Sequence, residues 1–196
     1  MKEILSQLDG WCDIKKAEYL RDLVVKEKAQ TIVDVGVFEG RSTLALVEGC
    51  RSQKSGTVTA VDSWSLRDWA ESMREEEKAD WPGLELADHL EVFLREVKRN
   101  EAWPYLDIRV KSSQSVCPFF SDKSVDVVHL DGNHKKISSL RDAEIWLPKV
   151  KKHGIIVIAM SNNEEKKKSV EYIANRCYFK ETLDFDACYS TVFRKR

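Results

Sequence analysis

The chain has 196 residues, of which 42% are hydrophobic and 33% charged, and its 32 basic residues nearly balance 33 acidic ones. These values are typical of one globular domain whose core needs neither disulfides nor a structural metal. A net charge of −1 disfavours nucleic acid as a partner and provides no general attraction to anionic lipid. No apolar run approaches the roughly 20 residues that span a bilayer, so we expect no membrane anchor.

Cysteine usage and the N-terminal sequence both bear on the cellular compartment. The five cysteines are scattered, odd in number and without a CxxC spacing, which favours free thiols in a reducing environment over disulfides or a zinc site. The first residues, MKEILSQLDGWC, are too charged for the apolar core of a signal peptide. We therefore expect a cytoplasmic protein.

The first half of the chain reads as a helix followed by a βαβ unit. Residues 14–28 place apolar side chains on one helical face, and Thr31–Val37 is a β-branched run typical of a strand buried on both faces. After Gly36 and Gly40, the pattern RSTLALVEGC predicts a helix that ends near Gly49. Residues 57–64 then predict a second, parallel strand, because a crossover helix joins parallel neighbours.

The second half alternates strands and helices once more. Strands are expected at residues 106–110, 125–131 and 154–160, with a helix stopped by Pro148 before the last of them and a turn at His153-Gly154. After a lysine-rich helix (164–175), two segments in 179–195 predict an antiparallel hairpin at a sheet edge. The chain is thus α/β: a single domain (1–196) with a mostly parallel sheet and helices on both faces. The polar stretch 66–100, inserted between core strands, is expected to be a helical lid over the substrate.

In such sheets a ligand binds beyond the carboxyl ends of the strands, so the residues that end each strand are the candidates for a site. Gly36 permits a tight turn and Gly40 permits the next helix to begin close to a ligand. Asp62 ends the second strand, where a carboxylate can accept hydrogen bonds from two ribose hydroxyls, and Trp64 follows it, where an indole can stack on a base. Each residue also has an ordinary structural explanation, as part of a strand–helix turn, a helix cap or edge packing.

Asp131-Gly132-Asn133-His134 is the sharpest constellation. A carboxylate and an imidazole three residues apart in a turn at a strand end can face one pocket. A near-neutral His134 could take a proton from an acceptor hydroxyl as it attacks a methyl group. The alternative is a histidine that caps the next helix or bonds to neighbouring backbone. His89, His129 and His153 have no comparable context and are assigned no role.

Taken together, these segments resemble the class I S-adenosylmethionine-dependent methyltransferases, specifically the small-molecule branch called the methyltransferase-24 type. The matching stretches are GWC, KKAEYLRDLVV, IVDVGVFEGRSTLAL, VTAVDSW and VVHLDGNHKKISSLRDAEIWLPKVKKHGIIV. The resemblance covers most of the chain and implies a Rossmann-like methyltransferase fold with a seven-stranded sheet.

The resemblance also implies a role for individual residues. S-adenosylmethionine (SAM) would meet Asp34, Gly36, Glu39, Gly40 and Ser42 at its methionine end. Its adenosine would meet Asp62, Ser63, Trp64, Ser112 and Ser113. Asp131 and His134 would face the sulfonium and the acceptor, and are the expected catalytic residues.

Two positions depart from the family pattern. His153 stands where a second glycine is usual before the fifth strand, and Met160, followed by Ser161, stands where an acidic residue commonly ends it. In metal-dependent relatives that acidic residue is a ligand, and with Asp131 alone the site lacks the oxygen donors that a hard cation requires. Asn162 or Asn163 is a partial substitute, but metal-independent transfer is the expectation.

The sequence therefore predicts a SAM-dependent methyltransferase (EC 2.1.1.-) that methylates a hydroxyl of a small molecule. Three alternatives stay open: methylation of a protein or RNA, transfer to nitrogen rather than oxygen, and a cofactor-binding regulatory module without turnover, suggested by His153 and Met160. A nicotinamide dehydrogenase is disfavoured because the first turn lacks the third glycine of G-x-G-x-x-G. Nothing in the sequence decides between a monomer and a homodimer.

Overall fold

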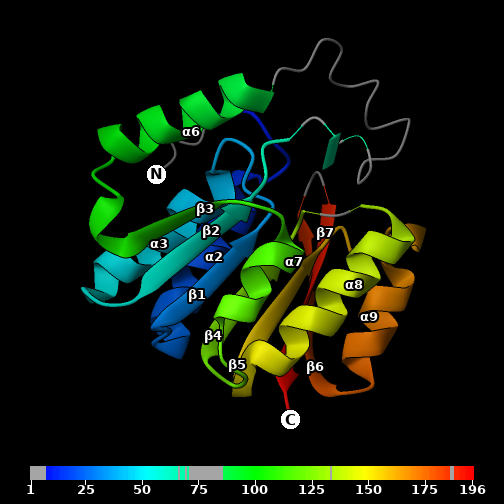
Figure 1. The fold of residues 1–196 in the computed structure, drawn as a ribbon. Coiled ribbons are helices and arrows are strands. Elements are labelled where there is room, and N and C mark those ends of the chain that lie inside the picture. Colours follow the sequence, from blue (N-terminus) through cyan, green and yellow to red (C-terminus); the bar gives the residue numbers. More distant parts are fainter. Residues whose placement is uncertain (1–7, 66, 69, 71–85, 133, 186–187) are drawn as a thin grey trace.

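The computed structural model describes residues 8–65, 67, 68, 70, 86–132, 134–185 and 188–196, and its centre is one seven-stranded sheet (Figure 1). The strand order is β3-β2-β1-β4-β5-β7-β6. Strands β1 to β5 run parallel, and β7 is antiparallel to both β5 and β6. The strand bounds are Thr31–Val35 (β1), Thr57–Asp62 (β2), Leu106–Val110 (β3), Val125–Leu130 (β4), Val150–Ala159 (β5), Cys177–Phe185 (β6) and Cys188–Lys195 (β7). The predicted mostly parallel sheet with a C-terminal hairpin is confirmed.

Helices cover both faces of the sheet. Successive side chains of its central strands point to opposite sides, so each strand contributes to both apolar clusters. Ile32, Val127 and Ile155 face one apolar cluster, and their neighbours Val33, Val128 and Ile156 face the other. Helices α2 (Ile14–Glu27) and α3 (Arg41–Gln53) cover the first face. Helices α8 (Lys136–Trp146) and α9 (Lys167–Ala174) cover the second, with the short α7 (Ser113–Val116) beside them (Figure 1).

Helix α3 is longer than its sequence suggests. It runs to Gln53, past Gly49, where the sequence predicts its end. Helices α2 and α3 pack so closely that a Cβ on Gly49 would lie 2.7 Å from the Arg21 carbonyl oxygen and from Cβ of Val24. The glycine therefore marks a close helix–helix contact, and the prediction that the helix ends there is wrong.

Strand β5 also differs from its predicted bounds, because it begins at Val150 and passes through His153-Gly154. The predicted turn is instead an irregularity within the strand: Val125 of β4 pairs with Val150, but Val127 pairs with Ile155. His153 has a left-handed backbone (φ 65°) at this point. In one kind of β-bulge a residue, usually glycine, adopts this conformation, and here it is a histidine.

Only part of the expected lid falls within the described residues. Residues 66, 69 and 71–85 lie outside them, whereas α6 (Leu86–Arg99) is a regular helix. It buries Phe93 and Val97 in the α2/α3 side of the core. No helix in the described portion of the chain has the length and apolar character needed to cross a membrane.

Candidate active site

A cavity of about 350 Å³ lies where β1, β2 and β4 end, together with the start of α7. This is the edge of a doubly wound sheet at which ligands bind. Eight of the residues predicted for the site line the cavity: Gly36, Ser42, Asp62, Ser63, Ser112, Ser113, Asp131 and His134. Four others, namely Asp34, Glu39, Gly40 and Trp64, are not part of the lining.

The loops after β1 and β4 touch at the floor of this cavity. Gly36 has φ 90°, and a Cβ built on it would lie 2.4 Å from Cα and N of Gly132. No side chain can be accommodated against backbone at that distance, so position 36 requires glycine for both its conformation and its surroundings. The contact brings the glycine turn beside Asp131.

Asp62 clamps the glycine loop to the end of β2. Its Oδ2 accepts hydrogen bonds from the backbone N–H groups of Val37 (2.9 Å) and Phe38 (3.1 Å), and its Oδ1 accepts one from Trp64 (2.9 Å). Burial raises the pKa of Asp62, although these three N–H groups favour its charged form. A carboxylate offers about four acceptor positions, so about one remains for a ligand, where the sequence suggested two ribose hydroxyls.

Trp64 and Gly40 are structural neighbours of α6. The Trp64 indole is only 7% exposed, donates from Nε1 to the Phe38 carbonyl (2.9 Å) and stacks on Phe93 at 5.6 Å. A Cβ on Gly40 would lie 2.3 Å from the Phe93 ring. The expectation that Trp64 stacks on a base is therefore not supported by its placement, and the absence of a side chain at Gly40 makes room for Phe93 rather than for a ligand.

Asp34 and Glu39 hold structural elements around the cavity in place. Asp34 is fully buried and accepts hydrogen bonds from the hydroxyls of Ser42 (2.8 Å) and Thr43 (2.6 Å), so it fixes the first turn of α3. Glu39 accepts a hydrogen bond from the backbone N–H of Asp9 and pairs with His89 at 2.7 Å. Neither carboxylate reaches the cavity lining, so direct contact with a cofactor, as the resemblance implied, is not supported for either.

The loop after β3 is held by the helix across from it. Nε1 of the buried Trp146 in α8 donates a 2.7 Å hydrogen bond to Oγ of Ser113, and Oγ of Ser112 lies 2.9 Å from Oγ of Ser115. The side chains of both predicted serines are thus engaged within the protein. What they present to the cavity is the first turn of α7, including Gln114.

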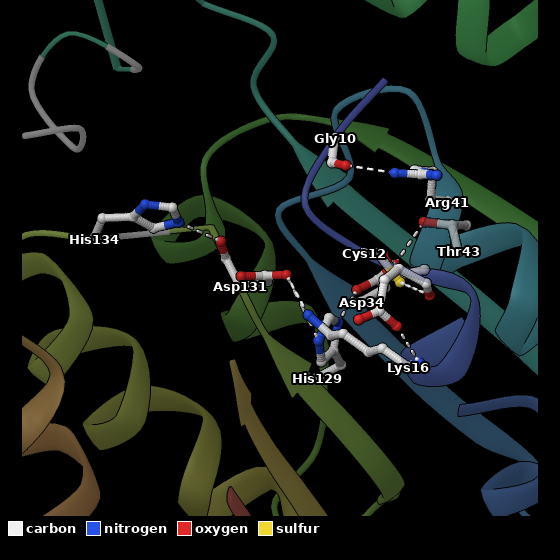
Figure 2. Close-up of polar contacts among 11 residues, drawn as sticks. Gly10, Cys12, Lys16, Asp34, Arg41, Thr43, His129, Asp131 and His134 are labelled. Atoms are coloured by element: carbon white, nitrogen blue, oxygen red, sulfur yellow. Dashed lines mark hydrogen bonds and ion pairs between the residues drawn. The ribbon is translucent and has the colours of Figure 1, made fainter. Parts of the chain in front are cut away.

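Asp131 and His134 meet at the fourth strand end, as their spacing predicts. His134 is 1% exposed overall, packs its ring 5.2 Å from that of Trp11, and lies with Nε2 3.1 Å from the backbone oxygen of Asp131 (Figure 2). A carbonyl oxygen only accepts, so Nε2 carries the proton and the lone pair of the neutral ring is on Nδ1. His134 therefore makes the backbone contact that the sequence offered as an alternative, and it also lines the cavity.

Several site residues carry no clear signal in the sequence. The segment Asp9–Cys12 forms one wall of the cavity, tied down by Glu39 and by Arg41, whose guanidinium donates to the Gly10 carbonyl. Beneath the cavity, the Lys16 ammonium lies 2.8 Å from Oδ2 of Asp131, and His129 bonds to Asp34 (Figure 2). These contacts join residues about 100 positions apart, which no local pattern encodes.

The end of β5 offers few donors for a cation. The Ser161 hydroxyl accepts a hydrogen bond from Thr191 (2.7 Å), and Oδ1 of Asn163 accepts the backbone N–H of Glu165 (3.0 Å) as a helix cap. Within the described residues, no three His, Cys, Asp or Glu side chains gather as a metal site would need.

A glycine turn after the first parallel strand and an acidic residue ending the second, on one cavity, define a class of protein that binds a nucleoside-containing ligand. The model of one such family, a methyltransferase domain, matches residues 33–159. The chain belongs to this family, the methyltransferase-24 type of class I SAM-dependent methyltransferases.

Solved structures give the same fold. The O-methyltransferase TomG of Streptomyces achromogenes, involved in tomaymycin synthesis and solved with SAM, has a TM-score of 0.72 at 11% identity over 99% of this chain and 90% of its own. An O-methyltransferase from Bacillus cereus, solved with S-adenosylhomocysteine (SAH), has 0.67 at 16% over the same shares. A methyltransferase from Geobacter sulfurreducens has 0.67 at 12%, over 93% and 80%. Proteins of curated function give no significant sequence match.

Proposed function

We propose that this methyltransferase methylates a hydroxyl group of a small molecule, without a metal ion. The observation that carries the proposal is the cavity that Gly36, Asp62, Asp131 and His134 line together. The oxygen acceptor is suggested by the similar folds of TomG and the Bacillus cereus enzyme, both O-methyltransferases. The near-neutral charge of the chain favours a small acceptor over RNA.

The cavity fits a methyl-donor nucleoside. Its volume of about 350 Å³ is in the range of small-molecule sites, and the glycine turn at Gly36 is part of its lining. In this proposal Asp62 accepts a ribose hydroxyl, the first turn of α7 meets the adenine, and Ser42 with the start of α3 meets the methionine end. When bound, SAM supplies an electrophilic methyl group on a positively charged sulfur.

His134 is the proposed general base. Its Nε2–H is oriented by the Asp131 carbonyl, so the lone pair of the neutral ring is on Nδ1, and we assign the acceptor's hydroxyl proton to this nitrogen. Trp11 packs against the ring and limits its rotation. Ser65 and Asp68 also line the cavity, so the beginning of segment 66–100 reaches the site. This placement supports the proposal that the segment covers the acceptor.

Metal-independent transfer is proposed from the chemistry of the donors. Ca²⁺ binds about six to eight oxygen ligands, and Mg²⁺ requires an octahedral set of ligands. The carboxylate Asp131 is already paired with Lys16, and Met160 offers no oxygen from its side chain. We expect turnover to be unchanged by EDTA, and a loss of activity that Mg²⁺ restores would contradict this.

Isothermal titration of the purified chain with SAM, SAH and NAD tests the proposed cofactor site. We expect micromolar binding of both sulfur nucleosides, no binding of NAD, and at least tenfold weaker nucleoside binding in Asp62→Asn. The exposed Asp22→Asn on α2 is the matched control and should bind as the wild type does. Absence of nucleoside binding to folded wild-type protein would refute the assignment of this cavity.

The alternative of a cofactor-binding module without turnover is tested at His134. With a panel of phenols and sugar hydroxyls as acceptors, SAH release is compared for wild type and His134→Gln. Loss of general-base catalysis should lower kcat about 100-fold while SAM affinity changes less than threefold. If wild type binds SAM but methylates no acceptor of the panel, and His134→Gln changes nothing, the module without turnover is favoured.

A further inference from the structure

A lysine is buried directly beneath the proposed methyl-transfer site. Lys16 lies in the first turn of α2, where Asp13 caps the helix by accepting its backbone N–H. Its side chain is 1% exposed, and Nζ lies 2.8 Å from Oδ2 of Asp131, which is itself 17% exposed. Figure 2 shows the ammonium reaching across from α2 to the end of β4.

Burying an ammonium is costly, and a lysine is almost never fully buried without a partner. Asp131 is that partner. Although burial opposes ionisation, Lys16, and more weakly His129, His134 and Lys166, hold the pKa of Asp131 below its ordinary value. The Asp131 carboxylate at the cavity is therefore charged, and the Lys16 ammonium beneath it supplies the opposite charge.

A second line of buried groups reaches the same oxygen. His129 pairs with Asp34 across β1 and β4 through Nδ1 (2.7 Å), and its Nε2 lies 3.8 Å from Oδ2 of Asp131. This Nε2 is buried and makes no hydrogen bond to any described residue. The Cys12 thiol also lies close to Lys16 and Asp131, and burial raises its pKa to about 12 despite Lys16, so it stays neutral.

Oδ2 of Asp131 is thus fixed from below, which leaves Oδ1 as the oxygen for a ligand in the cavity. We propose that Lys16 is a positioning residue of the reaction: its fixed ammonium orients the Asp131 carboxylate and balances its charge beneath the bound sulfonium. This inference rests on the proposed function, because it concerns the charge of the methyl donor.

The balance of charge affects the transfer step itself. As the acceptor oxygen forms its bond to the methyl carbon, the carbon–sulfur bond breaks and its electron pair stays on sulfur, which becomes neutral. The acceptor proton passes to Nδ1 of His134. Positive charge therefore moves from the sulfur to the His134 ring during the step. A carboxylate without its counter-charge would stabilise the sulfonium of the ground state more than the transition state, in which the sulfur has already lost part of its charge, and so slow the transfer.

Replacement of Lys16 by glutamine removes the charge and keeps a hydrogen-bond donor. SAM carries the sulfonium charge and SAH does not, so the ratio of their affinities reports the charge balance at Asp131. We expect Lys16→Gln to raise the preference for SAM over SAH about tenfold, measured by calorimetry, and to lower kcat with a synthetic phenol acceptor while KM for SAM falls. Lys16→Met should behave alike, and Lys16→Arg should stay near the wild-type ratio.

Lys26→Gln, at an exposed position of the same helix, is the matched control and should leave both affinities unchanged. A purely structural Lys16 would weaken SAM and SAH binding by the same factor in folded Gln and Met variants, and that result would overturn the inference while leaving the proposed function intact. If wild-type protein binds neither nucleoside, the proposed function fails first. Circular dichroism establishes which variants are folded.

Discussion

At the scale of single residues, His153 occupies a backbone conformation that costs an L-amino acid about 1–2 kcal/mol. Its φ is 65°, it lies in the irregular part of β5, and its side chain is exposed. What the fold uses here is the backbone, since the His153 carbonyl accepts a hydrogen bond from Arg194 (2.8 Å). Any residue supplies that carbonyl, but glycine supplies it without strain.

We therefore predict that His153→Gly stabilises the protein by about 0.5–1 kcal/mol, the relief of strain less the greater freedom of glycine in the unfolded chain. The midpoint of urea denaturation measures the change. Lys152→Gly, one residue earlier and without a positive φ, should instead be destabilising by about 0.5–1 kcal/mol. Equal effects at both positions would show that the left-handed backbone carries no penalty here.

Side-chain direction also explains which site residues the sequence can predict. The strand-end residues Gly36, Asp62 and Asp131 are predictable because parallel strands bring their carboxyl ends to one edge. The expected cofactor contact of Asp34 is not supported, because the side chain lies under α2 and α3. Alternation along the strand predicts this position, since it puts Asp34 on the same face as Ile32. Its partner His129 escapes prediction because their pairing depends on the register between β1 and β4, which neither strand encodes alone.

At the scale of elements, Gly49 is a residue of low helix propensity that stands inside α3 because the packing against α2 leaves no room for a side chain. In an exposed helix interior, alanine is favoured over glycine by about 1 kcal/mol. Here a methyl group on Gly49 would lie 2.7 Å from both the Arg21 carbonyl oxygen and Val24, which would force α2 and α3 apart. A pattern that reads glycine as a helix end cannot distinguish this case, because the contact belongs to two elements.

We predict that Gly49→Ala is destabilising by about 1–2 kcal/mol, since the cost of overpacking exceeds the gain in propensity. Thermal unfolding and urea titration measure the change. The matched substitution Ser52→Ala in the exposed last turn of α3 tests propensity alone and should be neutral or slightly stabilising. A stabilised Gly49→Ala would mean that the two helices separate at little cost.

At the scale of the whole molecule, the carboxyl ends of the parallel strands form the proposed site, and contacts at their amino ends hold neighbouring strands together. Asp126 in β4 accepts hydrogen bonds from the backbone N–H groups of Gln30 and Thr31 (both 2.9 Å) and pairs with Lys151 of β5 (2.7 Å). One carboxylate thereby joins the start of β1 to two neighbouring strands. It lies at the end of β4 opposite Asp131, so its removal should affect stability without altering the cavity.

The pH dependence of stability follows from this carboxylate. Burial raises the pKa of Asp126, but Lys151 and the two N–H groups outweigh it, so the folded pKa lies below the ordinary value. A lowered folded pKa means that the stabilisation is present above the unfolded pKa of about 4 and is lost as pH falls through the folded value. Asp126→Asn should therefore be less stable than wild type by about 1–2 kcal/mol at pH 7, and the difference should shrink toward pH 3.

Urea denaturation at pH 7, 5 and 3.5 measures this convergence, with the exposed Asp22→Asn as the control whose curve should run parallel to that of the wild type. SAM affinity of Asp126→Asn at pH 7 should equal the wild-type value, because the substitution and the cavity lie at opposite ends of β4. A difference between variant and wild type that is constant with pH would assign the effect to lost packing rather than to charge. Reduced SAM affinity would instead show that the two ends of the sheet are coupled through β4.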